Sequence, residues 1–278
     1  MRTLLLSSLW KLKLDSLSEQ QMSDEAKEEY VFLALRLLDQ HCEVYEQFAD
    51  FYISTDRPGE AFEVMQEFVE NAQNISQSTY IRALHTALPI YYATNQFDLL
   101  LPTFQYLIEY YQSAGTKTED ELAAFAKLMF QFSILADNMA LDHAETDYMK
   151  ALELYDQLRE RYNTTDLCAI GHIVNNLGCL YVESKQYEEA NTYFNRALKC
   201  FSHIAISNEN PMEIGLAMVY NNISILNRYQ GDEKTASRDI QYSAFIADHL
   251  STLTGEYEEM AKTIRKNSIL TRFLLRWM

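Results

Sequence analysis

The sharpest chemical feature of this sequence is a pair of adjacent asparagines that occurs twice. The pairs Asn175–Asn176 and Asn221–Asn222 are 46 residues apart. Asparagine is a mediocre helix former, so a pair inside a helix carries a cost that another interaction must offset. Each carboxamide donates and accepts hydrogen bonds, which suits pairing with the main chain of an extended peptide. The alternative is that the amides bond between neighbouring helices inside the protein, because buried amides must be satisfied in either case.

No motif for enzymatic chemistry accompanies these amides. The sequence contains no H-E-x-x-H zinc motif, no glycine-rich phosphate loop and no G-x-S-x-G nucleophile turn. The densest group of potential metal ligands is Asp142, His143, Glu145 and Asp147, at the start of an expected helix, from which the side chains spread instead of converging. The six histidines and four cysteines are scattered, with no C-x-x-C spacing. We therefore expect no enzymatic activity, no metal and no cofactor.

Composition predicts that helices position the asparagines. Seven glycines and four prolines in 278 residues leave few turn formers for a sheet protein, and good helix formers are abundant. A formal net charge of −17 makes direct binding to nucleic acid unfavourable. No apolar run reaches the roughly 18 residues of a membrane span. The first ten residues resemble a signal peptide only faintly, because Lys11 and Lys13 follow at once and no cleavage site appears, so we expect a cytoplasmic protein.

An internal repeat defines how the helices are organised. In residues 174–198, VNNLGCLYVESKQYEEANTYFNRAL, small residues at Gly178, Ala190 and Ala197 alternate with large ones at Leu177 and Phe194. Small residues let two antiparallel helices approach closely, and large ones fill the space between them. These residues resemble the tetratricopeptide repeat signature, although Val174 replaces the usual Trp and the closing Pro is missing. The resemblance implies a right-handed, all-α solenoid of helical hairpins.

Four weaker copies of this pattern give about five hairpins, with frames that start near residues 42, 81, 125, 171 and 217. Successive frames are 39 to 46 residues apart, longer than the usual ~34 of the family. Such long repeats resemble those of kinesin light chains and of bacterial peptide-pheromone receptors of the Rap and PlcR kind. We expect capping helices in residues 1–40, the repeat array in residues 41–253, and a basic amphipathic helix in residues 254–278 that either caps the stack or docks a further subunit.

The resemblance also implies a binding groove, because the first helix of each tetratricopeptide hairpin lines a concave face. Its frame positions predict a groove with an acidic N-terminal half, including Glu46 and Asp50, and an Asn-rich C-terminal half. The expected partner-binding residues are Tyr92, Phe130, His172, Asn175, Asn176, Asn221, Asn222, Arg228 and Tyr229. The clamp with which some family members grip acidic chaperone tails needs Lys or Arg at positions that hold Glu46, Asp50, Cys179 and Ile225 here, so that function is disfavoured.

The leading hypothesis from sequence is a protein- or peptide-binding adaptor that uses the concave groove. One alternative is the sensor domain of a peptide-responsive regulator, and another is a structural subunit of a larger effector complex. The expected partner is a protein or peptide. A homo-oligomer or larger complex would form through the C-terminal helix if that helix docks instead of capping.

Overall fold

The computed structural model describes residues 42–73, 76–115, 117–207, 214–254 and 257–270. The described residues form eleven α-helices and contain no β-strand, which confirms the predicted all-α class of stacked helical hairpins. The chain divides into two compact units, one ending at Ser113 and one beginning at Ala114. The predicted capping helices in residues 1–40 lie outside the described residues, as does the end of the predicted C-terminal helix, residues 271–278.

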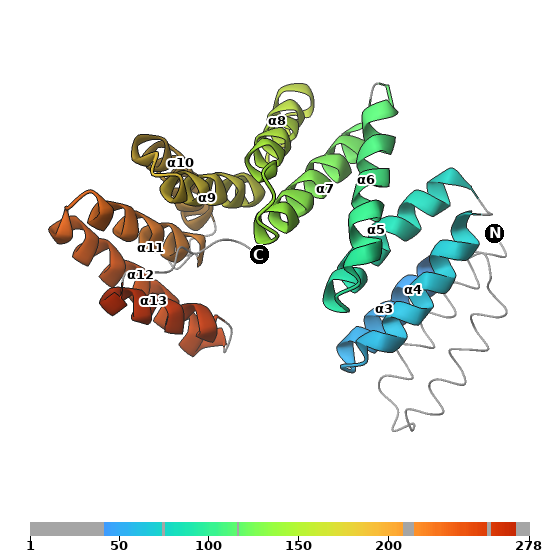
Figure 1. The fold of residues 1–278 in the computed structure, drawn as a ribbon, viewed down its shortest axis with the longest axis horizontal. Helices are drawn as coiled ribbons and strands as arrows, with labels where there is room; N and C mark the ends of the chain where they lie inside the picture. Colours follow the sequence, from blue (N-terminus) through green and yellow to red (C-terminus); the bar gives the residue numbers. More distant parts are fainter. Residues whose placement is uncertain (1–41, 74–75, 116, 208–213, 255–256, 271–278) are drawn as a thin grey trace. The chain divides into compact units, whose positions relative to one another are not determined.

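The described part of the first unit consists of two helical hairpins, whose helices are labelled in Figure 1. Their helices are α3 (Cys42–Ser54), α4 (Pro58–Gln73), α5 (Gln77–Ala93) and α6 (Phe97–Ser113). Helix α5 contacts both α3 and α4, so the second hairpin stacks on the first. Stacked rings of Tyr45 and Phe68, with centroids 4.7 Å apart, fill the space inside the first hairpin.

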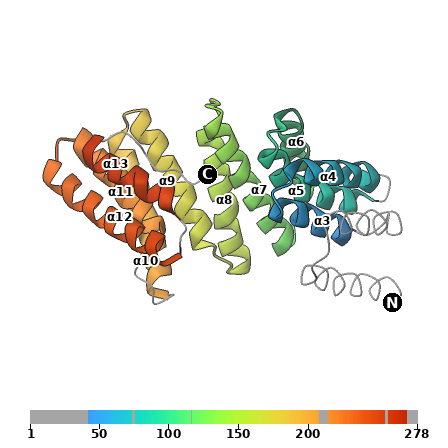
Figure 2. The ribbon, with the colours of Figure 1, turned by 90° about the horizontal axis from the view of Figure 1, so that it is seen from below.

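The second unit contains three hairpins and a terminal helix (Figures 1 and 2). Its helices are α7 (Glu119–Asn138), α8 (Ala144–Tyr162), α9 (Leu167–Glu183), α10 (Tyr187–Ser207), α11 (Ile214–Tyr229), α12 (Glu233–Thr254) and α13 (Glu258–Leu270). Helix α9 contacts α7, α8, α10 and α11, and α13 packs on α12. Each predicted frame start falls inside the first helix of a hairpin, while the predicted domain boundaries stay a prediction.

The same turn joins the two helices of all five hairpins. Two residues after the end of each first helix, one residue has left-handed backbone with φ between 52° and 85°. These five residues are Asp56, Asn95, Ala140, Lys185 and Gly231. In each turn the next residue donates its N–H to the carbonyl five residues back at 2.8 to 2.9 Å, and the left-handed residue itself bonds three residues back. This is the Schellman arrangement, in which the last carbonyls of a helix find partners. Only one of the five turns has glycine at the left-handed position, where glycine is the residue by which such a turn is recognised in a sequence.

Glycines at close contacts fix how tightly the hairpins pack. A Cβ added to Gly178 would lie 2.5 Å from the ring of Phe194 on α10. The ring of Phe201 meets two glycines: an added Cβ would lie 2.8 Å from it at Gly171 and 2.3 Å from it at Gly215. Phe201 is fully buried, and its ring bridges α9 and α11. The expected close contact at Gly178 is present, and both Ala190 and Ala197 are fully buried beside it.

Candidate functional site

The two asparagine pairs lie inside the second unit and bond to each other. All four side chains are fully buried, on α9 and α11. The Asn222 amide donates to Asn175 Oδ1 at 2.9 Å, which joins the two helices. Within the pairs, Asn175 donates to Asn176 Oδ1 at 3.3 Å and Asn221 donates to Asn222 Oδ1 at 3.0 Å. The four carboxamides therefore form one continuous chain of hydrogen bonds, which we name the amide ladder.

Further polar groups extend the amide ladder in both directions. At one end Asn176 donates to the Tyr148 hydroxyl on α8 at 2.9 Å, and this hydroxyl donates to Asp137 Oδ2 on α7 at 3.3 Å. At the other end Asn267 on α13 donates to Asn221 Oδ1 at 2.8 Å. Arg228 donates to the backbone carbonyl of Asn267 at 2.9 Å. The connected groups reach from α7 to α13 and tie three hairpins and the terminal helix together.

Burial on every side of α9 and α11 explains why these amides must pair. Residues 169–179 of α9 are buried without interruption, as are residues 214–219 and 221–226 of α11. A helix buried all round has no face on which an amide can reach water, and a buried amide without a partner costs about 1–3 kcal/mol. The asparagine side chains bond between α9 and α11, as in the alternative to peptide binding that the sequence analysis left open. A direct contact of these four amides with a peptide stays a prediction, and it would require α9 and α11 to be uncovered.

Three other predicted groove residues of the second unit are also largely buried. Phe130 is 8% exposed, and its ring centroid lies 6.5 Å from that of Tyr148, beside the amide ladder. His172 packs on Phe201 at 4.9 Å between centroids, and burial lowers the pKa of its imidazole to about 4. Arg228 has a side chain only 13% exposed. Phe130 thus packs on Tyr148 and Arg228 bonds to Asn267, the residues that extend the amide ladder at its two ends. His172 lies one helical turn before Asn176.

The remaining two predicted groove residues are exposed aromatics and lie in different units. Tyr229, at the end of α11, is 55% exposed, and its ring stacks on Tyr187 with centroids 6.0 Å apart. Tyr92, near the end of α5, is 48% exposed. Neither residue contributes to the amide ladder. Asn267 and the Tyr148 hydroxyl extend the ladder, but neither is among the expected partner-binding residues. Tyr148 lies on the second helix of a hairpin and Asn267 on a helix after the last repeat frame, so the frame positions of the first helices mark neither residue.

The first unit offers an exposed surface on its first helices, which we name the α3–α5 face. Glu46, Asp50 and Ile53 follow one side of α3, and Arg82, Thr86 and Pro89 follow one side of α5, at the spacing of three and four residues that shares a helix face. Both nitrogens of the Arg82 fork donate to the Glu46 carboxylate, at 2.7 and 2.6 Å. The Thr86 hydroxyl adds a bond to Glu46 at 3.3 Å. Asp50, Ile53, Arg82 and Pro89 are exposed, and Tyr92 lies at the edge of this face.

Two of the three carboxylates considered as metal ligands, Glu145 and Asp147, have protein partners. Asp147 Oδ2 lies 2.5 Å from His143 Nδ1, and Glu145 accepts a hydrogen bond from the Tyr181 hydroxyl at 2.5 Å. In the part of the chain that the structure describes, no group of three or more His, Cys, Asp or Glu side chains is arranged to hold a metal ion. None of the described helices is long and apolar enough to cross a membrane.

A shallow hollow of about 480 Å³ lies between α8 and α10. Its lining combines apolar and charged side chains: Met149, Leu152, Glu153, Asp156, Gln157, Glu160, Tyr193 and Arg196. Lys150 pairs with Glu153 at 2.8 Å, and Arg159 pairs with Asp156 at 2.9 Å. Because these bases offset two of the three carboxylates, the hollow has no strong charge preference.

Comparisons with known proteins agree with this architecture. A family model described as tetratricopeptide repeat matches residues 171–199, in hairpin α9–α10. No curated protein sequence matches the chain. Among solved structures, BtubC (BKLC) from P. vanneervenii is similar, with a TM-score of 0.54 and 16% sequence identity over 80% of this chain and 96% of that chain. At this identity the likeness shows the fold alone. Together the findings support a protein of the tetratricopeptide type, and the long-repeat subtype stays a prediction.

Proposed function

We propose that the chain is a non-enzymatic, protein-binding adaptor whose partner docks on the α3–α5 face. The tetratricopeptide match points to the broad class of interaction scaffolds. One observation carries the choice of surface: the α3–α5 face leaves first-helix positions exposed, whereas α9 and α11 bury theirs. A partner meets side chains at α3 and α5 without any rearrangement of helices.

The chemistry of the α3–α5 face suits a segment with both apolar and polar side chains. Ile53 and Tyr92 are 40% and 48% exposed and provide apolar contact area. Aromatic side chains are enriched among the residues that dominate binding energies. Arg82 and Glu46 are partly exposed and fixed in position by their two-pronged ion pair, so they present a preorganised donor and acceptor. The proposed surface therefore has an aromatic anchor beside an ordered polar pair.

In this proposal the amide ladder is the framework of the second unit. Its hydrogen bonds hold α8, α9, α11 and α13 in one arrangement. Buried polar networks of this kind can specify one packing arrangement when every member is satisfied. The framework would keep the second unit rigid while the first unit binds.

Capture of a partner by the full chain from its native host, followed by mutagenesis, tests the proposed surface. Tyr92→Ala should weaken binding of the captured protein by about fivefold or more, since truncation of an aromatic anchor costs about 1 kcal/mol or more. Ile53→Asp should have a similar effect. The matched control is Tyr106→Ala, because Tyr106 is 41% exposed on α6, away from this face. Retained binding in both α3–α5 variants, or equal loss in the control, would refute the proposal.

A further inference from the structure

Helix α12 carries an exposed aromatic surface in the second unit. Tyr242 and Phe245, one helical turn apart, are 42% and 57% exposed. Arg238 and His249 lie four residues before and after them and extend the same side of the helix. We name Arg238, Tyr242, Phe245 and His249 the α12 stripe. The Arg238 side chain is 74% exposed, so the stripe combines a guanidinium with three rings.

Tyrosine and phenylalanine are absent from the equivalent positions of the earlier hairpins, although the Tyr242 ring also packs edge-on against Tyr220 of α11 with centroids 4.8 Å apart. Ala144, Ala190 and Ala236 are equivalent buried residues of α8, α10 and α12. Counted from them, the positions of Tyr242, Phe245 and His249 hold Lys150, Glu153 and Gln157 on α8, and Arg196, Lys199 and His203 on α10. At the first two positions the two earlier hairpins thus present charged side chains where the last one presents Tyr242 and Phe245, and at the third position α10 and α12 both have histidine. Large apolar groups exposed together in this way mark interaction surfaces.

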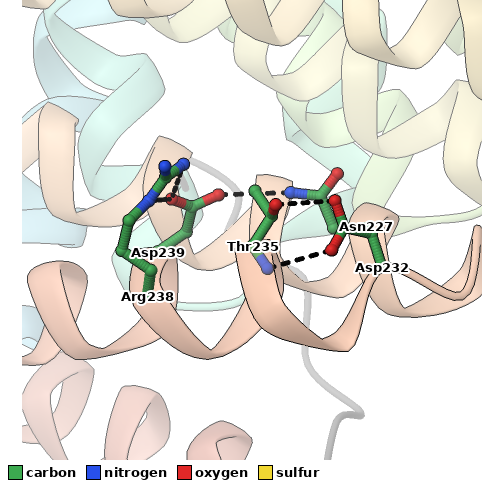
Figure 3. A network of polar contacts seen from close by, with 5 residues as sticks. All are labelled: Asn227, Asp232, Thr235, Arg238 and Asp239. Carbon is green, nitrogen blue, oxygen red and sulfur yellow. Dashed lines mark hydrogen bonds and ion pairs between the residues drawn. The ribbon is translucent and has the colours of Figure 1, made fainter.

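The charges around the α12 stripe are balanced, unlike those of the chain as a whole. Asp239 is only 3% exposed, and its carboxylate accepts hydrogen bonds from Arg238 at 2.8 Å and from Asn227 of α11 at 3.2 Å (Figure 3). Asp248 pairs with Arg265 of α13 at 2.7 Å. With a net charge of −17, two copies of this chain repel each other over most of their surfaces. At the α12 stripe the nearby carboxylates are paired, so this repulsion is locally small.

We propose that the α12 stripe is the interface with a second copy of this chain, with the two α12 helices packed antiparallel. A twofold axis between Tyr242 and Phe245 places Tyr242 of each copy against Phe245 of the other. The same axis places Arg238 of each copy beside His249 and Asp248 of the other. The stripe is therefore complementary to itself, which a twofold interface requires. Aromatic rings and arginine, the residue types that dominate interface energies, provide its centre.

Analytical ultracentrifugation of the full chain across micromolar concentrations tests this interface. Wild-type protein should form dimers, and Phe245→Glu should raise the dissociation constant by more than about tenfold. Phe97→Glu is the matched control, because Phe97 is 41% exposed on α6 and the chemical change is the same. Circular dichroism of both variants shows whether each keeps its helical fold. Added salt should strengthen the dimer, since it screens repulsion between two acidic chains.

Three outcomes overturn the proposal. Wild-type protein that stays monomeric at hundreds of micromolar has no such interface. A dimer that Phe245→Glu leaves intact, or that Phe97→Glu disrupts equally, forms through another surface. A monomeric chain that captures a different protein through Phe245 assigns the α12 stripe to that protein instead. These results concern the second unit alone, so they leave the proposed adaptor surface of the first unit untouched.

Discussion

In both units a hydrogen bond joins the first helices of two successive hairpins, but the bonded groups differ in burial and in charge. In the first unit Thr86 of α5 bonds to Glu46 of α3 at 3.3 Å. In the second unit Asn222 of α11 bonds to Asn175 of α9 at 2.9 Å, and these residues occupy the same two frame positions. In the first unit the bonded carboxylate of Glu46 also forms a partly exposed ion pair with Arg82. In the second unit both bonded groups are neutral amides and are fully buried. Equivalent repeat positions therefore form a surface in one unit and a core in the other.

The difference accompanies the packing of one aromatic ring against the first helices of the second unit. Gly171 of α9 and Gly215 of α11 both lie against the Phe201 ring of α10, which occupies the space that their side chains would fill. Close packing buries their inner positions, where a charge would be costly and an amide can be satisfied by another amide.

Close packing of the second unit should make Gly178→Leu strongly destabilising. A Cβ at Gly178 already meets the Phe194 ring at 2.5 Å, so a leucine forces α9 and α10 apart. We expect a loss of about 3 kcal/mol of unfolding free energy, at the upper end for overpacked cores. Urea denaturation measures it. Gly59→Leu in the first unit is the control, because an added Cβ there meets nothing within 4 Å. Equal losses at both glycines would show that the second unit is not the more tightly packed.

Burial of His172 should make stability depend on pH. Its pKa in the folded protein is about 4, below the ordinary 6.5, because burial disfavours the charged imidazolium. The unfolded chain therefore binds a proton first, so this contribution is complete above pH 6.5 and is lost as the pH falls from 6.5 toward 4. The loss amounts to at most about 3 kcal/mol. Urea midpoints measured across this range should show it.

The variant His172→Gln isolates this contribution from that of the carboxylates. Carboxylates titrate mostly below the upper part of this window, so they contribute little between pH 6.5 and 5. The variant should be less dependent on pH in that interval than the wild type. An unchanged pH profile would mean that the imidazole is accessible to water and that α9 is less enclosed than the structure indicates.

Loss of an amide should cost more in the second unit than loss of the equivalent group in the first. Asn222→Ala removes the buried hydrogen bonds that this amide donates to Asn175 and to the Cys179 sulfur, so we expect about 1–3 kcal/mol of destabilisation. Asn176→Ala should behave similarly. Thr86→Ala should cost less than about 0.5 kcal/mol, because water can replace its hydroxyl. Thermal unfolding of the three variants decides the point.

The peptide-binding hypothesis predicts the opposite pattern for the asparagines. If the amides bind a peptide backbone, Asn176→Ala and Asn222→Ala should leave the melting temperature nearly unchanged and weaken partner binding by about 1–3 kcal/mol. Asn195→Ala is a control for both hypotheses, since Asn195 is exposed on α10 and bonds to the backbone of its own helix.

Sequence predicted the all-α class of stacked helical hairpins, because close helix packing restricts residue size at Gly178, Ala190 and Ala197. The Thr-x-x-Glu spacing at Thr118 and Glu121 is a sequence signature of a helix start, and the structure contains this capping box. Sequence could not decide whether the asparagines face a groove or one another. That depends on how far α9 and α11 are enclosed, which arises from many contacts at once and not from a motif. Asn267 completes the amide ladder from a helix outside the repeat, where periodicity gives no information.

The same hairpin turn occurs in both units. Replacing its left-handed residue by glycine should change the free energy of unfolding through backbone conformation alone. Lys185 has φ of 63°, where a side chain clashes with its own backbone and glycine does not. Lys185→Gly relieves this strain but increases the freedom of the unfolded chain, so the net gain should be about 0.5 kcal/mol. Lys199→Gly is the matched control, since Lys199 is also exposed but lies inside α10, where glycine costs about 1 kcal/mol. The two substitutions should therefore shift the urea midpoint in opposite directions. A shift in the same direction would mean that the lysine side chain at 185 makes a stabilising contact that outweighs its backbone strain.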